Sequence, residues 1–148
     1  MKTGKHKLIL TLLFELCIGL ILFSHEPANA QDSKNREANI LFVKIEEGLG
    51  TGAVDKFSKY FAGKNYISLI SGSSGYYSAN QSYYVIKDFL SVYQPISFKI
   101  TNSVIDTANP FASGTLKFNN KGIRGTATVF VSLQFVDNQW RISQITIN

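Results

Sequence analysis

Hydrophobic residues recur at helical spacing in the first half of the chain. In residues 38–49, Leu41, Ile45 and Leu49 follow one another at intervals of four, which places them on one face of a helix. In residues 53–63, a second apolar stripe predicts a short helix that ends at Gly63 in a left-handed cap. Two helices are therefore expected before any strand.

A third helix has the clearest start signal in the sequence. Ser78-Ala79-Asn80-Gln81 fits a capping box, in which the serine side chain binds the N3 amide and the glutamine reaches back. Ile86, Leu90 and Tyr93 give this helix an apolar face, with Val85 and Phe89 beside them, and Pro95 ends it. We expect the helix to extend from residue 79 to about residue 92.

Beyond Pro95 the apolar residues alternate with polar ones, and this period of two predicts four successive strands. A further strand at residues 66–70 precedes the third helix and is followed by a flexible turn at residues 71–75. The four later strands are expected at residues 96–100, 111–118, 127–135 and 140–147, with turns between them at 109–110, 119–122 and 137–139. In the last strand, Trp140 and Ile142 differ in parity from Ile145 and Ile147, so a bulge is expected near Ser143-Gln144.

The order helix, helix, strand, helix and four strands predicts an α+β fold. Three N-terminal helices should cover one face of a curved, mainly antiparallel sheet. On the central strand, the alternating residues Val129, Val131, Leu133 and Phe135 should face the helices. Their core partners should be Phe57, Phe61, Phe89 and Leu90.

The first 30 residues have the pattern of an export signal. Residues 1–7 are basic, residues 8–23 are apolar, and Ala28 and Ala30 are small residues before an expected cleavage between Ala30 and Gln31. Two alternatives are a membrane anchor, disfavoured by the short apolar run and its Glu15, and a lipoprotein attached at Cys17. We expect an exported protein, periplasmic or extracellular, without stable membrane insertion after cleavage. Residues 31–37 should form a flexible tail and residues 38–148 one domain.

Removal of this signal limits the chemistry of the mature chain. The 148-residue chain has a net charge of +5, and its histidines, His6 and His25, and its one cysteine, Cys17, all lie in the signal. The mature part therefore has no residues for a zinc finger, a Ser–His–Asp triad, a c-type haem or a disulfide, and we expect no metal and no cofactor. Its basic residues form no run, so nucleic acid is not an expected partner.

Few residues are placed for chemistry, and none is assigned as catalytic. Asp106 follows a strand end, where burial would suit it as a general base, but an aspartate that initiates the turn at 106–110 is the simpler interpretation. Tyr76, Tyr77 and Tyr84 crowd around the third helix start and, with Trp140, are candidates to line a pocket for an apolar ligand. The alternative is that these aromatic residues belong to the core and to an ordinary amphipathic surface.

The face of the central strand that points away from the helices has no charge. It carries Thr128, Phe130, Ser132 and Gln134, whereas a solvated face more often carries lysine and glutamate. An uncharged face can pack against its own copy, so we predict a two-fold homodimer with Phe130 near its centre. The alternative is a monomer in which Phe130 is exposed or covered by the N-terminal tail.

The order of elements and several short motifs resemble the cone-shaped nuclear transport factor 2-like (NTF2-like) superfamily. These motifs are Lys59-Tyr60-Phe61-Ala62, Tyr77-Ser78, Lys87-Asp88-Phe89-Leu90, Pro95-Ile96-Ser97-Phe98-Lys99, Gly114-Thr115-Leu116 and Trp140-Arg141-Ile142 with Ile145. Within the superfamily the sequence is most similar to the secreted bacterial branch called domain of unknown function 4783 (DUF4783). The resemblance implies a bent sheet that encloses a pocket with the helices, and dimers formed through the sheet surface.

Three functions fit these patterns. The first is an exported, non-enzymatic domain that binds a small apolar molecule or a protein partner. The second is an isomerase- or hydratase-type enzyme that uses a single carboxylate and tyrosine hydroxyls, and the third is a dimeric structural module with a filled interior. The first is favoured because a mature chain without histidine, and with scattered carboxylates, offers no acid–base pair at a recognisable spacing.

Overall fold

The computed structural model describes residues 28–148 of the chain. Two α-helices, α2 (Ala28–Thr51) and α3 (Ala79–Val92), accompany six strands: β1 (Phe61–Leu69), β2 (Ser74–Tyr77), β3 (Gln94–Val104), β4 (Phe111–Asn120), β5 (Ile123–Val136) and β6 (Gln139–Ile147). Contacts divide the chain into two units between Lys34 and Asn35. All sites described below lie in the second unit, residues 35–148.

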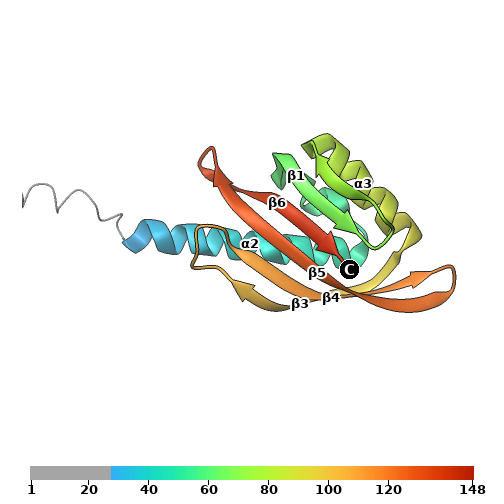
Figure 1. Cartoon of the computed structure of the whole chain (residues 1–148). Coiled ribbons are helices and arrows are strands. Elements are labelled where there is room, and N and C mark those ends of the chain that lie inside the picture. Colours follow the sequence, from blue (N-terminus) through green and yellow to red (C-terminus); the bar gives the residue numbers. More distant parts are fainter. Residues whose placement is uncertain (1–27) are drawn as a thin grey trace, which may run out of the picture. The chain divides into compact units, whose positions relative to one another are not determined.

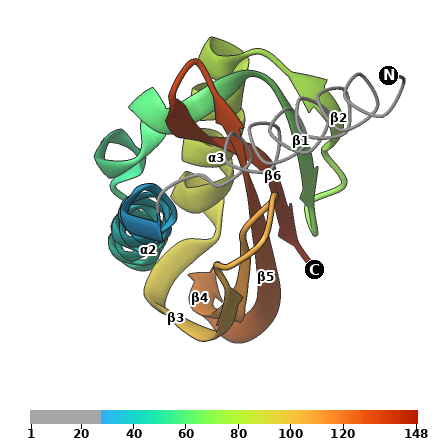
Figure 2. The ribbon, with the colours of Figure 1, turned by 90° about the vertical axis from the view of Figure 1, so that its left-hand side faces the viewer.

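The six strands form one mixed sheet in the order β2-β1-β6-β5-β4-β3 (Figure 1). The β1–β6 pair is parallel and every other neighbouring pair is antiparallel. Figure 2 shows α3 and α2 on the same side of the curved sheet. Their apolar faces meet the inner residues of the strands, and Ile45, Ile86 and Leu133 are all fully buried there. The predicted α+β class is confirmed.

The predicted second helix is wrong. Residues 53–63 form two single turns of 3₁₀ helix, η1 (Val54–Lys56) and η2 (Ser58–Tyr60), and the chain then enters β1 at Phe61. Phe57 separates the two turns with φ −129°, which is not helical. Gly63 lies inside β1 and has no positive φ, so it caps no helix. The fold therefore has two α-helices among the described residues instead of the three expected.

The structure also moves the start of α2 and adds a strand. Residues 31–37, expected as a flexible tail, are helical, because this polar stretch holds no glycine or proline and several good helix formers. Ser74–Tyr77, expected as the end of a turn and the approach to α3, pairs with β1 as an edge strand. The predicted signal segment lies outside the described residues except for Ala28–Ala30. No helix within residues 28–148 has the length and hydropathy needed to cross a membrane.

Most of the predicted core is confirmed. Leu41, Ile45 and Leu49 are buried along α2, and the capping box of α3 is present, with Ser78 Oγ accepting from Gln81 N–H and Gln81 Oε1 accepting from Ser78 N–H. The predicted inner residues of β5 are buried except Phe135, which is half-buried and packs against the core. The four later strands also form where alternation predicts them.

Bulges in β6 and β3 decide which side chains face outwards. In β6 the register shifts so that Ser143 has no partner on β5, which confirms the predicted bulge and buries Trp140, Ile142, Ile145 and Ile147 together. In β3 one bulge leaves Ile96 without a partner on β4, and another leaves Thr101 without one. Ile96 is 51% exposed as a result, although in a regular strand it would share the face of the buried Phe98, two residues later. Pro95 takes the half-buried position opposite Phe118 instead.

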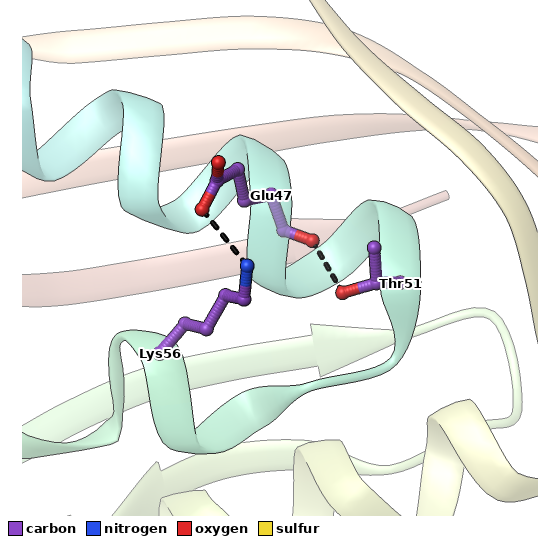
Figure 3. A network of polar contacts seen from close by, with 3 residues as sticks. All are labelled: Glu47, Thr51 and Lys56. Carbon is purple, nitrogen blue, oxygen red and sulfur yellow. Dashed lines mark hydrogen bonds and ion pairs between the residues drawn. The ribbon is translucent and has the colours of Figure 1, made fainter.

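Polar contacts hold the C-terminal end of α2 to its neighbours. Lys56 Nζ lies 3.0 Å from Glu47 Oε2, and Thr51 Oγ1 donates to the Glu47 carbonyl at 2.7 Å (Figure 3). On another side of α2, Glu46 Oε2 accepts from the backbone N–H of Ile100 at 2.9 Å, and Glu46 Oε1 accepts from Lys99 Nζ at 3.0 Å. The Ile100 hydrogen bond and the Lys99 ammonium lower the pKa of Glu46 against a smaller opposing effect of burial. The helix is thereby fixed to the edge strand β3.

A buried polar centre joins β1 to α3. Asn65 is fully buried, and its side chain accepts from the Ala62 N–H at 2.9 Å and donates to the Ala62 carbonyl at 2.8 Å. Asn65 Nδ2 also donates to Ser82 Oγ at 3.0 Å, and Ser82 Oγ donates to the Ser78 carbonyl at 2.8 Å. Every polar atom of Asn65 therefore has a partner, as a buried amide requires.

Candidate functional site

A cavity of about 220 Å³ lies where α2, η2 and β6 meet. Its walls come from residues far apart in the sequence: Glu37, Ile40, Leu41, Tyr60, Gln139 and Trp140. The space between the helices and the sheet further along is filled by large buried side chains such as Phe57, Leu116 and Ile145. The cavity thus lies at one end of a packed core.

Trp140 is placed in this cavity by the β5–β6 turn. Asp137 and Asn138 both have positive φ, 51° and 59°, as a two-residue hairpin turn requires. The Trp140 ring, only 6% exposed, meets the Phe135 ring edge to face with 5.0 Å between centroids. The predicted placement of Trp140 in the core and its candidacy for a pocket are therefore compatible, because one part of its ring is packed while the residue also lines the cavity.

The η2 wall is tied to β6. The Arg141 guanidinium donates to the Lys59 carbonyl at 2.7 Å, which links η2 to the strand that carries Trp140. Lys59 Nζ lies 5.1 Å from the centroid of the Tyr60 ring, a distance suited to a cation–π contact. These contacts position the Tyr60 wall relative to Trp140.

The lining residues offer an apolar body with a few polar groups. Ile40, Leu41 and the rings of Tyr60 and Trp140 supply apolar surface, while Glu37 supplies a carboxylate and Gln139 an amide. This composition suits a small apolar molecule with one hydrogen-bonding group. Glu37 is the one carboxylate among these lining residues, so the cavity has no pair of carboxylates for acid–base chemistry.

The tyrosines predicted to join Trp140 lie elsewhere. Tyr76 on β2 is 67% exposed and packs edge to face on Tyr66, with Lys64 Nζ 4.5 Å from its ring centroid. Tyr77, on the opposite face of β2, is half-buried against the core. The two tyrosines therefore point to different sides of the sheet.

Tyr84 lies on the surface of α3 and is 54% exposed. Its ring meets that of Tyr83, and Lys87 Nζ donates to the Tyr83 hydroxyl at 3.1 Å. This hydrogen bond is the main cause of a raised pKa of Lys87. Of the predicted pocket residues, Trp140 alone lines the cavity, and Tyr76, Tyr77 and Tyr84 form no common site with it.

Asp106 lies in the β3–β4 loop and is exposed. The backbone N–H of Thr107 donates to the Ile105 carbonyl at 2.9 Å, which closes a tight turn around Asp106. This geometry matches the turn interpretation of Asp106 and lacks the burial that the general-base interpretation requires. Within residues 28–148, no three metal-ligating side chains gather in one place.

The outer face of the sheet carries two rows of uncharged side chains across all six strands. The strand registers place these residues opposite one another. One row is Asn102, Ser113, Phe130, Thr146, Ser68 and Ser74, and the other is Val104, Phe111, Ser132, Gln144, Tyr66 and Tyr76. Phe111 and Phe130 stack at their centre with 5.6 Å between ring centroids. We call these twelve residues the uncharged face; it includes Phe130 and Ser132 of the predicted dimer surface, with Thr128 and Gln134 at its two borders.

Residues 42–148 match the family model of the domain of unknown function DUF4783. The chain belongs to the DUF4783 family. The resemblance found in the sequence is therefore confirmed. No curated protein matches the chain.

Solved structures agree with this assignment. The DUF4783 protein of Bacteroides uniformis superposes with a TM-score of 0.65 at 20% identity, covering 72% of this chain and 94% of its own. The DUF4783 protein of Bacteroides ovatus has a TM-score of 0.62 at 23% identity, covering 70% of this chain and 90% of its own. An NTF2-like protein of unknown function from Shewanella oneidensis has a TM-score of 0.53 at 12% identity, covering 76% of this chain and 96% of its own. These likenesses show that the DUF4783 chain has an NTF2-like fold.

Proposed function

We propose that this DUF4783 protein is an exported, non-enzymatic domain that binds one small apolar molecule in the Trp140 cavity. The proposal rests on the cavity itself, whose walls combine two aromatic rings and two aliphatic side chains with a carboxylate and an amide. Concave sites with mostly apolar walls and a few polar groups are the usual form of small-molecule sites. The family membership supports the fold on which this proposal rests.

The size of the cavity limits the ligand. Its volume of about 220 Å³ lies below the roughly 300–1,000 Å³ of drug-sized pockets. It exceeds the roughly 150 Å³ of a dry engineered cavity that takes up benzene. The ligand class is therefore a single ring or a short alkyl chain with one hydroxyl or amino group. That group would donate a hydrogen bond to the side-chain oxygen of Glu37 or Gln139.

The enzymatic alternative has weaker support. An isomerase or hydratase run by one carboxylate and tyrosine hydroxyls needs those groups around one substrate. Asp106 lies exposed in the β3–β4 loop, while Tyr76 and Tyr84 lie on other surfaces. Glu37 and Tyr60 both line the cavity, and they are the residues on which this alternative would depend.

The test uses Trp140, the one tryptophan of the chain, as the reporter. Cyclohexanol, a ring with one hydroxyl that does not absorb at tryptophan excitation wavelengths, is titrated while Trp140 emission is recorded. A saturable change is expected. Ile40→Phe, which narrows the cavity, should weaken binding at least about tenfold, whereas Val43→Phe should not. Val43 is the matched control because both residues are aliphatic, on α2, and about half exposed, at 50% and 55%.

Two results would count against the proposal. One is an emission change that rises linearly with cyclohexanol, which indicates a solvent effect on Trp140. The other is equal binding by the Ile40→Phe and Val43→Phe variants, which would place the ligand outside the cavity. Recovery of the processed chain from outside the cytoplasm, beginning at Gln31, would test the export part separately.

A second candidate function is self-association through the uncharged face. The Phe111–Phe130 stack lies at the centre of two rows without an ionised side chain, and such a face packs against its own copy at little desolvation cost. Light scattering at micromolar concentration should then give a dimer. Phe130→Glu should give a monomer, and Val92→Glu, on the end of α3, should leave the dimer intact. A wild-type mass of one chain would defeat this candidate.

A further inference from the structure

A groove of about 490 Å³ lies on strands β3, β4 and β5. Its lining residues are Ile96, Ser97, Lys117, Arg124, Gly125 and Thr126. It lies towards the β4–β5 turn at residues 121–122, whereas Trp140 follows the β5–β6 turn at the other end of β5. The groove is therefore separate from the Trp140 cavity and shares no residue with it.

The strand registers build this groove. Ser97 pairs with Lys117, and Lys117 pairs with Thr126, so two hydroxyls flank one ammonium in a single row. Arg124 lies two residues before Thr126 on β5 and therefore projects from the same face of the sheet. The bulge in β3 adds the exposed Ile96 to the same lining. Cations, hydroxyls and one apolar side chain thus meet in one concave surface.

Within the described residues, the cations of the groove are not neutralised by ion pairs. Lys117, Arg124 and the neighbouring Lys121 make no ion pair with any residue in the part of the chain that the structure describes. Asp106 is the one carboxylate between residues 94 and 136, and it lies in the β3–β4 loop, at the far end of β4. Lys99, by contrast, is paired with Glu46. Two unpaired cations that line a concave surface, Lys117 and Arg124, attract an anion.

We infer that this groove binds a small anionic amphiphile, a molecule with a phosphate or carboxylate group attached to a short apolar chain. Lys117 and Arg124 hold the anionic group, since charge-assisted hydrogen bonds are the strong ones, and Ser97 and Thr126 donate to its remaining oxygens. Ile96, 51% exposed, contacts the apolar chain. The concave shape favours a free molecule over a bilayer surface.

The probe is octyl phosphate below its critical micelle concentration. Its binding to the full domain is measured by isothermal titration calorimetry. Wild type should bind it more tightly than inorganic phosphate, and added salt should weaken the binding. The variant Lys117→Gln/Arg124→Gln should lose about tenfold or more in affinity, because each charged contact contributes substantially. Lys44→Gln/Lys64→Gln is the matched control that removes the same net charge away from the groove, and it should bind as wild type does.

Ile96→Ser separates the apolar contact from the charge. It should weaken octyl phosphate binding and leave inorganic phosphate binding unchanged. Because Ile96, Lys117 and Arg124 are surface residues, the thermal unfolding midpoint of each variant should match that of wild type, which checks that folding is intact.

Four outcomes would overturn the inference. They are no binding of octyl phosphate by wild type, equal loss in the groove and control variants, equal affinity for inorganic and octyl phosphate, and binding only to phosphatidylglycerol vesicles. The last would identify a bilayer as the partner. Cyclohexanol titrations of the groove variants should be unchanged, so this test fails or succeeds independently of the Trp140 cavity.

Discussion

Glu46 Oε2 accepts a 2.9 Å hydrogen bond from the backbone N–H of Ile100, 54 residues further along the chain. Ile100 belongs to β3, which is an edge strand because it pairs with β4 alone. An unpaired N–H on an edge strand is a template for another chain. The carboxylate of α2 occupies that donor and thereby protects the edge.

The first prediction concerns pH. Glu46 in the unfolded chain titrates near 4.5, and its pKa in the folded protein is lower. The ionised carboxylate therefore adds stability above pH 4.5, and this contribution is lost as the pH falls through the folded-state pKa. Glu46→Gln should cost about 1 kcal/mol at pH 7, and the difference from wild type should shrink below pH 4.5. Urea denaturation at pH 7, 5 and 3 measures the free energy of unfolding of both proteins. A difference between them that does not change with pH would contradict this prediction.

The second prediction concerns Gly114, which pairs with Ile100 across β3 and β4. A Cβ added there would overlap the Lys99 carbonyl oxygen and lie 2.8 Å from Ile100 Cα, so the two strands would have to separate. Gly114→Ala should lower the free energy of unfolding by about 1–3 kcal/mol. Gly63→Ala is the control, because its Cβ would meet nothing within 4 Å, and it should be neutral. Equal effects would mean that the close approach does not constrain residue 114.

The third prediction concerns the buried amide of Asn65. Asn65→Ala leaves the Ala62 N–H and carbonyl without partners and should cost about 2–4 kcal/mol. Ser82→Ala, which removes one acceptor of Asn65, should cost about 1 kcal/mol. Because the two side chains contact each other, their effects in a double-mutant cycle should be less than additive. Simple additivity in chemical denaturation would contradict the network.

The fourth prediction concerns the inner face of β5. Leu133 is fully buried, so Leu133→Ala should cost about 2–5 kcal/mol through the cavity that it leaves. Gln134, the next residue, points to the other face, and Gln134→Ala should change stability by no more than about 0.5 kcal/mol. A loss below about 0.5 kcal/mol for Leu133→Ala would disagree with its burial.

Alternation and capping predicted the elements whose signals are local. The bulge at Ser143 follows from the parity of four apolar residues in one strand, and the α3 start follows from four consecutive residues. The bulge at Ile96 has no such signal, because Ile96, Phe98 and Ile100 alternate with polar residues as they would in a regular strand. The prediction of a short helix at residues 53–63 was wrong. An apolar stripe over so few residues does not distinguish an α-helix from 3₁₀ turns followed by a strand.

The candidate site was less predictable than the fold. Trp140 was identified from its residue type, but Ile40 and Glu37 reach the cavity from a helix some hundred residues earlier. The one sequence signal for them is that Ile40 is an aliphatic residue outside the Leu41, Ile45 and Leu49 stripe. The groove cations are likewise ordinary surface residues in the sequence, and only strand register brings Lys117 and Arg124 together.

The parallel pair of β1 and β6 has a consequence for the folding rate. Although β6 comes last in the sequence, it lies between β1 and β5, and Ile67 pairs with Ile145. The β3–β5 meander closes through short turns, whereas β1, β2 and the attached α3 can join the sheet only after a long loop closes around β6. We therefore expect the two parts of the sheet to associate late in folding, when the β1–β6 pair forms.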